Sequence, residues 1–148
     1  MDDFEFAFPA LYRRAYGVAF VVLGDRTEAE DIASEVAARA LVRWSRVGDY
    51  AEPWAIRVAG NLSIDRIRRQ ARVESPRGEA EPASRVERVD LQRALVRLPK
   101  RQREVVVLRY IADLSESDVA RALGCSAGTV KSQSSRGLAA LRVALGEP

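Results

Sequence analysis

The sequence predicts an all-α protein in which two small helical domains are joined by a flexible linker. Apolar residues recur at three- and four-residue steps in both halves of the chain, and no stretch alternates at period two as a half-buried strand would. Between the halves, residues 73–85 are rich in Pro, Gly, Ser and Glu and show no periodicity, which is typical of a linker. The length of 148 residues suits two marginal domains, which we place at residues 1–72 and 86–148.

Three helices are predicted in the first domain. The apolar pattern predicts the first helix over residues 3–23, followed by a turn at a Gly-Asp pair. The second helix begins at a predicted capping box formed by residues 27–30, in which a Thr hydroxyl and a Glu carboxylate satisfy free backbone amides, and it runs to about Trp44. A loop over residues 48–53 leads to the third helix, at about residues 54–72.

Four helices are predicted in the second domain. The first covers about residues 86–98 and ends at a Pro, and the next covers residues 101–111. Ser115 can cap a third helix that runs to about Leu123, and a last helix covers residues 126–145.

The composition excludes several kinds of chemistry. The chain has no His and a single Cys, so a His-dependent catalytic triad, a haem, an iron–sulfur cluster, a disulfide and a Cys-based zinc site are not expected. The sequence also lacks a Gly-rich phosphate loop and a paired-carboxylate motif. We therefore expect neither an enzyme nor a cofactor.

The start of the chain and its apolar runs bear on where the protein acts. Residues 1–5 are acidic, unlike the basic start of a secretory signal. No apolar run approaches the roughly 18–20 residues of a membrane span. We therefore expect a cytoplasmic protein.

The net charge of +3 is carried by the second half of the chain. Residues 1–72 hold 11 basic and 11 acidic residues, whereas residues 73–148 hold 13 and 10. From Leu91 to Arg109, six basic residues stand beside Glu104 alone. A basic domain suits an acidic polymer such as DNA.

The spacing of residues 115–142 predicts a DNA-binding helix-turn-helix. Val119 and Leu123 are apolar residues four apart, and the small Ala120 between them allows close crossing of two helices. Gly124 takes the turn, where a positive φ costs Gly little. Val130 then anchors the second helix, and Cys125 is expected to tuck inward as a small apolar residue.

The second helix of this motif would place its N-terminal residues against base edges in the major groove. Hydroxyl and basic side chains there can meet phosphate or base edges. The candidates are Thr129, Lys131, Ser132, Ser135 and Arg136. The predicted inward stripe comprises Val130, Leu138, Leu141 and Leu145. Ser134 stands where an apolar residue would continue this stripe.

The helix that starts at Trp54 carries residues suited to reading an unpaired base. Trp54 and Asn61 are seven apart and share a face, so a ring could stack on a base while an amide meets its edge. Arg57 and nearby arginines could follow a phosphate backbone. The same residues also suit a structural role, with Trp54 in the core, Asn61 in a structural hydrogen bond and the arginines in solvent, and these residues alone leave both interpretations open.

The preceding helix carries a charged face. Asp31, Glu35 and Arg39 are spaced by four residues and therefore lie on one side of a helix. This side is either a protein-docking surface or a solvated face.

Four groups of residues occur in a fixed order along nearly the whole chain. They are Leu23-Gly24-Asp25 with residues 29–33; Trp54 with Asn61, Asp65 and Arg68; Leu98-Pro99 with Arg103, Leu108 and Tyr110; and residues 128–132 with Arg136-Gly137-Leu138 and Leu141-Arg142. Together they resemble the extracytoplasmic-function (ECF) group of bacterial RNA polymerase sigma factors, of the sigma-70 family. The short, Ala- and Arg-rich chain resembles the compact SigE family in that group.

The resemblance implies a sigma region 2 at residues 1–72 and a sigma region 4 at residues 86–148. Region 2 would bind the clamp helices of the polymerase beta-prime subunit through Asp31, Glu35 and Arg39. It would also open and read the minus-10 promoter element as a single strand. The residues that the resemblance and the helix pattern place there are Tyr50, Trp54, Arg57, Asn61 and Arg68.

Region 4 would read the minus-35 element as a duplex, through Lys131, Ser132, Ser135 and Arg136 together with the neighbouring Thr129. It would contact the beta flap through Leu91, Leu95 and Leu98. The partners implied are core RNA polymerase, promoter DNA and, as an open question, an anti-sigma factor. Because both domains would act from one polymerase, two weak DNA contacts suffice, and we expect the free chain to be a monomer that binds promoter DNA weakly.

Other classes of protein fit parts of the sequence. A stand-alone helix-turn-helix regulator would bind a palindromic operator as a dimer, but the pattern of Trp54, Asn61 and Arg68 favours a sigma factor. An anti-sigma or adaptor protein would not need Lys131 and Arg136 on a recognition helix.

Overall fold

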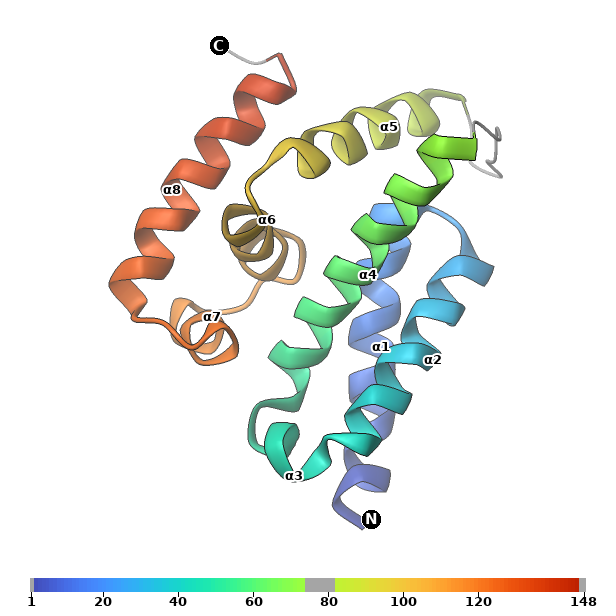
Figure 1. Ribbon diagram of the computed structural model, residues 1–148, viewed down its shortest axis with the longest axis vertical. Helices are drawn as coiled ribbons and strands as arrows, with labels where there is room; N and C mark the ends of the chain where they lie inside the picture. The colour runs from blue at the N-terminus through green and yellow to red at the C-terminus, as the bar shows by residue number, and fades with distance from the viewer. Residues whose placement is uncertain (1, 74–81, 147–148) are drawn as a thin grey trace.

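All regular structure in the part of the chain that the structure describes is helical, as predicted (Figure 1). This computed structural model describes residues 2–73 and 82–146. The first half contains α1 (Asp2–Leu23), α2 (Arg26–Val42), the short α3 (Trp44–Val47), the 3₁₀ turn η1 (Gly48–Tyr50) and α4 (Ala51–Val73). The second half contains α5 (Pro82–Arg97), α6 (Lys100–Val106), the π-helical segment η2 (Val107–Ile111), α7 (Glu116–Leu123) and α8 (Ala127–Ala144).

The first half is a bundle in which α1 packs against both α2 and α4. Each helix contributes the apolar residues of its three- and four-residue pattern to this core, as an amphipathic helix must. Leu11, Ile32 and Ile56, one from each helix, are fully buried. The predicted first-domain bundle is therefore present, with its three long helices in the predicted order.

Among the described residues, α1 alone is long and apolar enough to pass a test for membrane spans by length and composition. The same apolar residues, among them Leu11, Val18 and Val22, are buried in the bundle. Arg14 lies near the middle of this helix and donates a hydrogen bond to the carbonyl of Ala112, 2.9 Å away. The core thus accounts for part of the apolar character of α1, whereas Phe6 and Val21 of the same helix are exposed.

The start of α2 differs from the prediction. The predicted cap was Thr27, but the side chain of Asp25 accepts a 2.9 Å hydrogen bond from the Glu28 amide, and the helix begins at Arg26. Asp25 has an extended backbone, which is the conformation that an N-cap requires. The helix therefore starts earlier than the capping box indicated, and Thr27 lies inside its first turn, exposed.

This difference can be tested by stability measurements. We expect Asp25→Ala to lower the free energy of unfolding by about 0.5–2 kcal/mol, because an amide at the start of α2 loses its partner. Thr27→Ala is the matched control, and it should change stability by less than about 0.5 kcal/mol. Urea unfolding followed by circular dichroism measures both changes. If Thr27→Ala lost more free energy of unfolding than Asp25→Ala, Thr27 would be the cap of α2, as the capping box predicts.

The segment predicted as a loop before α4 is also helical. η1 occupies the first half of the loop predicted at residues 48–53, α4 already begins at Ala51, and α3 directly precedes η1. The reason is tertiary packing: Val47 is buried, and the Trp44 ring meets the Phe4 ring edge-on with centroids 5.4 Å apart. Contacts with the start of α1 therefore order a polar, Gly-containing segment.

Helices enter the predicted linker from both sides. α4 includes Val73, and α5 begins at Pro82, four residues before the predicted start of the second domain. A Pro in the first position of a helix costs no hydrogen bond, since its missing N–H has no partner there. The remaining residues of the predicted linker, 74–81, lie outside the described residues.

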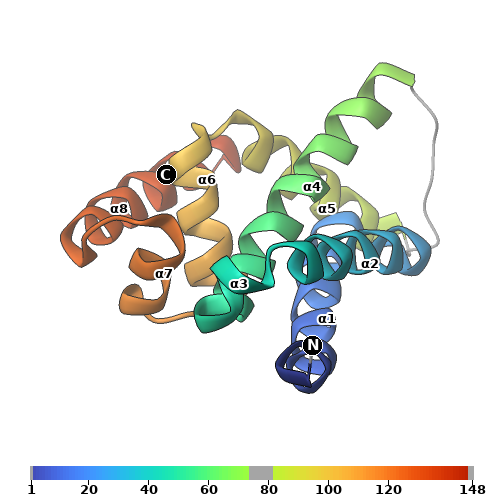
Figure 2. The same cartoon turned by 60° about the horizontal axis from the view of Figure 1, so that its bottom comes forward.

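The two halves pack against each other along α4 (Figure 2). α4 contacts η2, α6 and α7, while α5 contacts α1 and α4 as well as α8. The two halves come close together at Gly60, where an added Cβ would lie only 3.1 Å from Cγ1 of Val107. One apolar core thus runs through both halves, an arrangement that the sequence left open.

Candidate nucleic-acid interface

The predicted helix-turn-helix is formed by α7 and α8. Ser115 caps α7 by accepting a 3.1 Å hydrogen bond from the Asp118 amide, and Ser126 caps α8 by accepting one of 3.1 Å from Thr129. Gly124 ends α7 with φ +65°, the left-handed conformation that the spacing predicted for the turn. Residues next to the helix ends therefore determine where α7 and α8 begin and where α7 stops.

Apolar residues hold these two helices on the rest of the second half. Val119, Leu123 and Val130 are buried, as predicted. Cys125 is only partly buried, with its amide bonded to the Ala120 carbonyl at 3.0 Å. The predicted inward stripe on α8 ends early, since Leu145 is 40% exposed.

The outward face of α8 carries the predicted DNA-contacting residues. All five candidates are exposed: Thr129, Lys131, Ser132, Ser135 and Arg136. The Thr129 hydroxyl is 3.0 Å from the Ser126 hydroxyl, so it takes part in the cap. The other four side chains have no intramolecular hydrogen bond or ion pair within the described part of the chain. They are therefore available to a ligand.

Small residues let the opposite face of α8 approach α6. Ser134 is buried, and its hydroxyl donates to the Tyr110 hydroxyl at 3.2 Å, which explains a polar residue in the apolar stripe. Gly137 is buried as well, and a Cβ there would lie 2.8 Å from Cγ2 of Val106 and 3.2 Å from the Gln102 carbonyl oxygen. The recognition helix is thus seated by close contact rather than by large apolar side chains.

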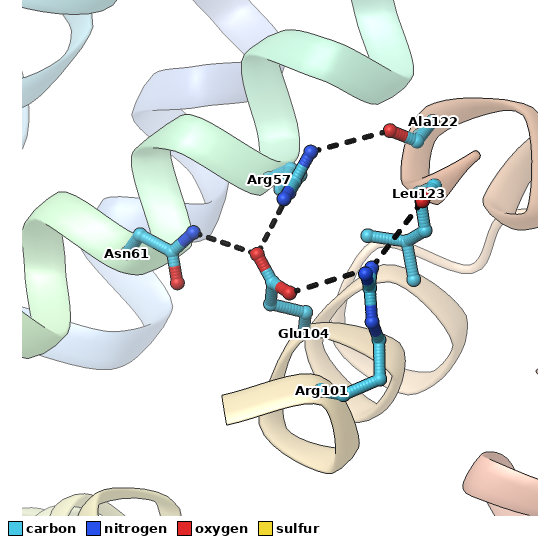
Figure 3. Close-up of polar contacts among 6 residues, drawn as sticks. All are labelled: Arg57, Asn61, Arg101, Glu104, Ala122 and Leu123. Carbon is cyan, nitrogen blue, oxygen red and sulfur yellow. Dashed lines mark hydrogen bonds and ion pairs between the residues drawn. The ribbon is translucent and has the colours of Figure 1, made fainter. Parts of the chain in front are cut away.

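The candidate minus-10 residues of α4 meet a buried carboxylate from α6 (Figure 3). Arg57 donates through Nε to Oε2 of Glu104 at 2.7 Å, and the Asn61 amide donates to the same oxygen at 2.9 Å. Nη1 of Arg101 lies 3.7 Å from the other oxygen. Glu104 is only 4% exposed, so the cluster joins the two halves through a desolvated charge.

The surroundings of Glu104 favour its ionised form. Burial would raise the pKa of Glu104, but the hydrogen bonds from Arg57 and Asn61 and the charges of Arg57 and Arg101 outweigh it, so the pKa lies below the ordinary value. Burial and the charge of Arg68 lower the pKa of the neighbouring Arg103, against the opposing charges of Glu104 and Asp65. The cluster is thus a charged one at neutral pH.

Helix α7 closes over the same place. Nη1 of Arg57 is 3.4 Å from the carbonyl oxygen of Ala122, and Nη1 of Arg101 is 3.4 Å from that of Leu123. The guanidinium of Arg121 lies 5.9 Å from the centre of the Tyr50 ring. Carbonyls at the end of α7 therefore complete the set of partners for both arginines.

The remaining minus-10 candidates lie on the same helix with different exposure. Trp54 is half-buried and packs against the core, which is compatible with both interpretations of this residue. Arg68 is exposed, about two turns beyond Asn61. The structure thus brings Tyr50, Arg57 and Asn61 to the contact between the two halves and leaves Arg68 outside it.

The predicted polymerase-binding residues of α2 form an exposed charged face. Glu35 and Arg39 pair at 2.8 Å, both about half exposed, and Asp31 lies 3.6 Å from Arg66 of α4. Exposed pairs of this kind contribute little to stability. These exposed pairs could therefore be exchanged for contacts with another protein at little cost in the stability of the fold.

The predicted flap-contacting leucines are placed differently. Leu95 and Leu98 are buried and Leu91 is half-buried against the core. In this conformation α5 uses these leucines to cover the other helices, so Leu95 and Leu98 offer no surface to a partner.

Sequence reasoning gave Glu104 and Arg101 no role. A signal for Glu104 was present, because it is the single acidic residue among six basic ones between Leu91 and Arg109. A lone carboxylate in a basic segment can be the partner of distant arginines, but its partners, Arg57 and Asn61, lie more than forty positions away. The described residues hold no cluster of metal-ligating side chains.

Comparisons with known proteins agree with these two halves. The chain matches the model of the family "Sigma-70 region 2" over residues 8–73 and that of "Sigma-70, region 4" over residues 88–141. The ECF RNA polymerase sigma factor SigW of Bacillus subtilis (strain 168) is 33% identical, and the match covers 87% of this chain and 81% of SigW. The RNA polymerase sigma-E factor of Streptomyces antibioticus is 38% identical over 80% of this chain and 71% of its own.

The arrangement of the helices also has a counterpart among solved structures. The sigma factor RpoE of Bartonella quintana, crystallised with the anti-sigma factor NepR, is similar over 99% of this chain and 98% of its own, with a TM-score of 0.61 and 22% identity. At that identity the likeness establishes the fold and nothing more.

A helical bundle followed by a helix-turn-helix, with hydroxyl and basic side chains exposed on its second helix, is typical of a DNA-binding transcription protein of two parts. The chain belongs to the sigma-70 family of RNA polymerase sigma factors, as a member of the ECF group. It directs transcription initiation by RNA polymerase at promoter DNA and, like other sigma factors, is not an enzyme. The match to region 2 excludes a stand-alone helix-turn-helix regulator.

Proposed function

We propose that this sigma factor reads the minus-35 element of its promoters with the outward face of α8. The observation that carries the proposal is the exposure of all five candidate residues on one side of a helix whose other side is buried. Lys131 and Arg136 can reach phosphate or the O6 and N7 atoms of guanine, and the hydroxyls of Ser132 and Ser135 can bond to phosphate or base edges. Thr129 would contribute from the first turn.

The minus-10 element would be read by region 2, which we place at residues 1–72, before a linker at 73–85 and region 4 at 86–148. A base flipped out of the duplex would stack on an aromatic ring, Trp54 or Tyr50. The Asn61 amide would meet its edge. Arg57 and Arg68 would hold the strand by its phosphates.

Polymerase binding would use the charged face of α2. Asp31, Glu35 and Arg39 would meet charges of opposite sign on the beta-prime clamp helices, which gives orientation and rate more than raw affinity. For the beta flap, Leu91 is the accessible member of the leucine group. Leu95 and Leu98 would take part only after α5 leaves its present place.

Two further properties complete the proposal. The relative from Bartonella quintana was crystallised with an anti-sigma factor, and a comparable inhibitor is a candidate partner for this chain. Its place of action would be the cytoplasm, where RNA polymerase meets promoter DNA, and the free protein would be a monomer.

Run-off transcription with core polymerase on a promoter library tests this function. We expect the wild-type chain to select an asymmetric promoter with two elements. On that promoter Arg136→Ala should reduce initiation by about fivefold to a hundredfold, the range for losing a guanine contact.

The matched control for this experiment is Arg142→Ala, which removes the same charge from an exposed position in the last turn of α8. It should retain nearly full activity. An equal loss for the two variants would contradict base reading by the first turns of α8. Failure of the wild type to initiate on any template would overturn the proposed function as a whole.

A further inference from the structure

We propose that Glu104 forms an autoinhibitory contact, in which its carboxylate occupies Arg57 and Asn61 and holds region 4 over the minus-10 reading face of α4 until polymerase separates the two domains. The proposal rests on the minus-10 role proposed above for these two residues, and it assigns a regulatory function to a residue outside the candidate DNA-binding and polymerase-binding sets.

The first argument is chemical. Arg57 and Asn61 present N–H donors that would serve a phosphate or a base edge, and a carboxylate offers the same kind of acceptor. Oε2 of Glu104 accepts from both donors, at 2.7 and 2.9 Å, and Arg101 faces Oε1. In the closed arrangement Arg57 and Asn61 are therefore already paired with a carboxylate, which accepts hydrogen bonds as a DNA phosphate or base edge would.

The second argument is access. Glu104 is buried, and Nη1 of Arg57 points to the carbonyl of Ala122 at the end of α7. Glu104 of α6 and the end of α7 lie on this side of Arg57, so a DNA phosphate can pair with its Nε only after Glu104 leaves (Figure 3). Arg121 of α7 also lies against the Tyr50 ring. Region 4 thus covers several of the proposed minus-10 residues at once.

The third argument is the balance of charge. In the closed arrangement Arg57, Arg101 and the buried Glu104 compensate one another's charge, and removing the carboxylate by substitution would leave the arginines there without compensation. In the assembled enzyme a DNA phosphate would replace the carboxylate as the partner of Arg57, while Glu104 regains water once α6 has moved. The contact is therefore stable in the free chain and exchangeable in the assembled enzyme. It also gives a structural reason for the weak DNA binding expected of the free chain.

The distance between the domains provides a direct test that involves no DNA. Cys125 is the only cysteine in the sequence, so a spin label there and a second at Val42→Cys, which is 82% exposed at the end of α2, report on region 4 and region 2. In pulsed electron resonance of the full-length chain we expect one short distance for the parent protein. Adding Glu104→Gln, which keeps the side-chain volume, should raise the population of longer distances about tenfold.

Two further variants make this test specific. Glu87→Gln removes a carboxylate from an exposed position of α5 in the same domain, and it should leave the distance unchanged. Gly60→Leu places a side chain against Val107 and should open the domains with every charge retained. If Glu104→Gln keeps the closed distance while Gly60→Leu opens, packing alone holds the domains and the proposal is overturned.

A DNA-binding measurement distinguishes failure of this proposal from failure of the proposed function. The probe is the single-stranded minus-10 sequence that the run-off library selects, fluorescently labelled and mixed with free protein. Glu104→Gln should bind it about tenfold more tightly than the wild type, and the double variant Glu104→Gln with Asn61→Ala should lose this gain. Opening without tighter binding would refute the occlusion of DNA-reading residues. Undiminished initiation by holoenzyme carrying Asn61→Ala would instead refute the minus-10 role itself.

Discussion

Replacing Leu95 by Ala is expected to lower the free energy of unfolding by about 2–5 kcal/mol, the range for removing a fully buried leucine. Leu95 is 0% exposed, and its helix, α5, contacts α1 and α4 of region 2 as well as α8 of region 4. The cavity would therefore lie where the two domains share one core. Urea unfolding of the full-length chain, followed by circular dichroism, measures the loss.

The control for this substitution is Leu145→Ala, which makes the same chemical change at a position that is 40% exposed beyond the end of α8. It should alter stability by less than about 1 kcal/mol. If Leu95→Ala were as mild as the control and instead weakened polymerase binding, Leu95 would serve the flap contact that the family resemblance implied. A large loss of stability supports its place in the core.

Gly137→Ala is expected to destabilise the protein by about 1–3 kcal/mol, the usual cost of forcing extra volume into a packed contact. Alanine is the better helix former, so propensity alone predicts the opposite sign. The added Cβ would meet Val106 at 2.8 Å and the backbone oxygen of Gln102 at 3.2 Å, and backbone cannot rotate away. Steric conflict between α8 and α6 therefore decides the outcome.

Gly128→Ala, in the first turn of the same helix, is the matched control. Its Cβ would meet only the Ser126 hydroxyl, at an ordinary 3.8 Å, and the substitution should stabilise the protein by about 0.4–1 kcal/mol. Thermal unfolding should show a lower Tm for Gly137→Ala and a higher Tm for Gly128→Ala. Stabilisation by Gly137→Ala as well would mean that α8 does not lie as close to α6 as the structure has it.

Local chemistry explains which parts of the fold could be predicted from the sequence. The turn at Gly124 and the cap at Ser115 depend on residues a few positions apart, and both are found as predicted. The exposed face of α8 follows from the helical repeat alone. Where two local signals competed, as Asp25 and Thr27 did for the start of α2, the sequence pattern favoured the wrong residue.

The parts that could not be predicted depend on distant contacts. Arg57 and Glu104 are 47 positions apart, and nothing in either neighbourhood indicates the other. Trp44 orders α3 by packing on Phe4, some forty residues earlier. The family resemblance gave Leu95 a contact with the beta flap, and an apolar pattern alone does not distinguish a core residue from a docking residue. Composition likewise left the packing of the two domains undecided.

The close approach of α4 to η2 at Gly60 also bears on solubility. Val107 and Leu108 of η2, with Leu95 of α5, are buried in the core that the two domains share. If the domains stayed apart in the free chain, part of this apolar surface would be open to water and to other chains, and exposed apolar patches promote aggregation. Closed packing thus keeps this apolar surface away from water and from other chains when the protein is not bound to polymerase.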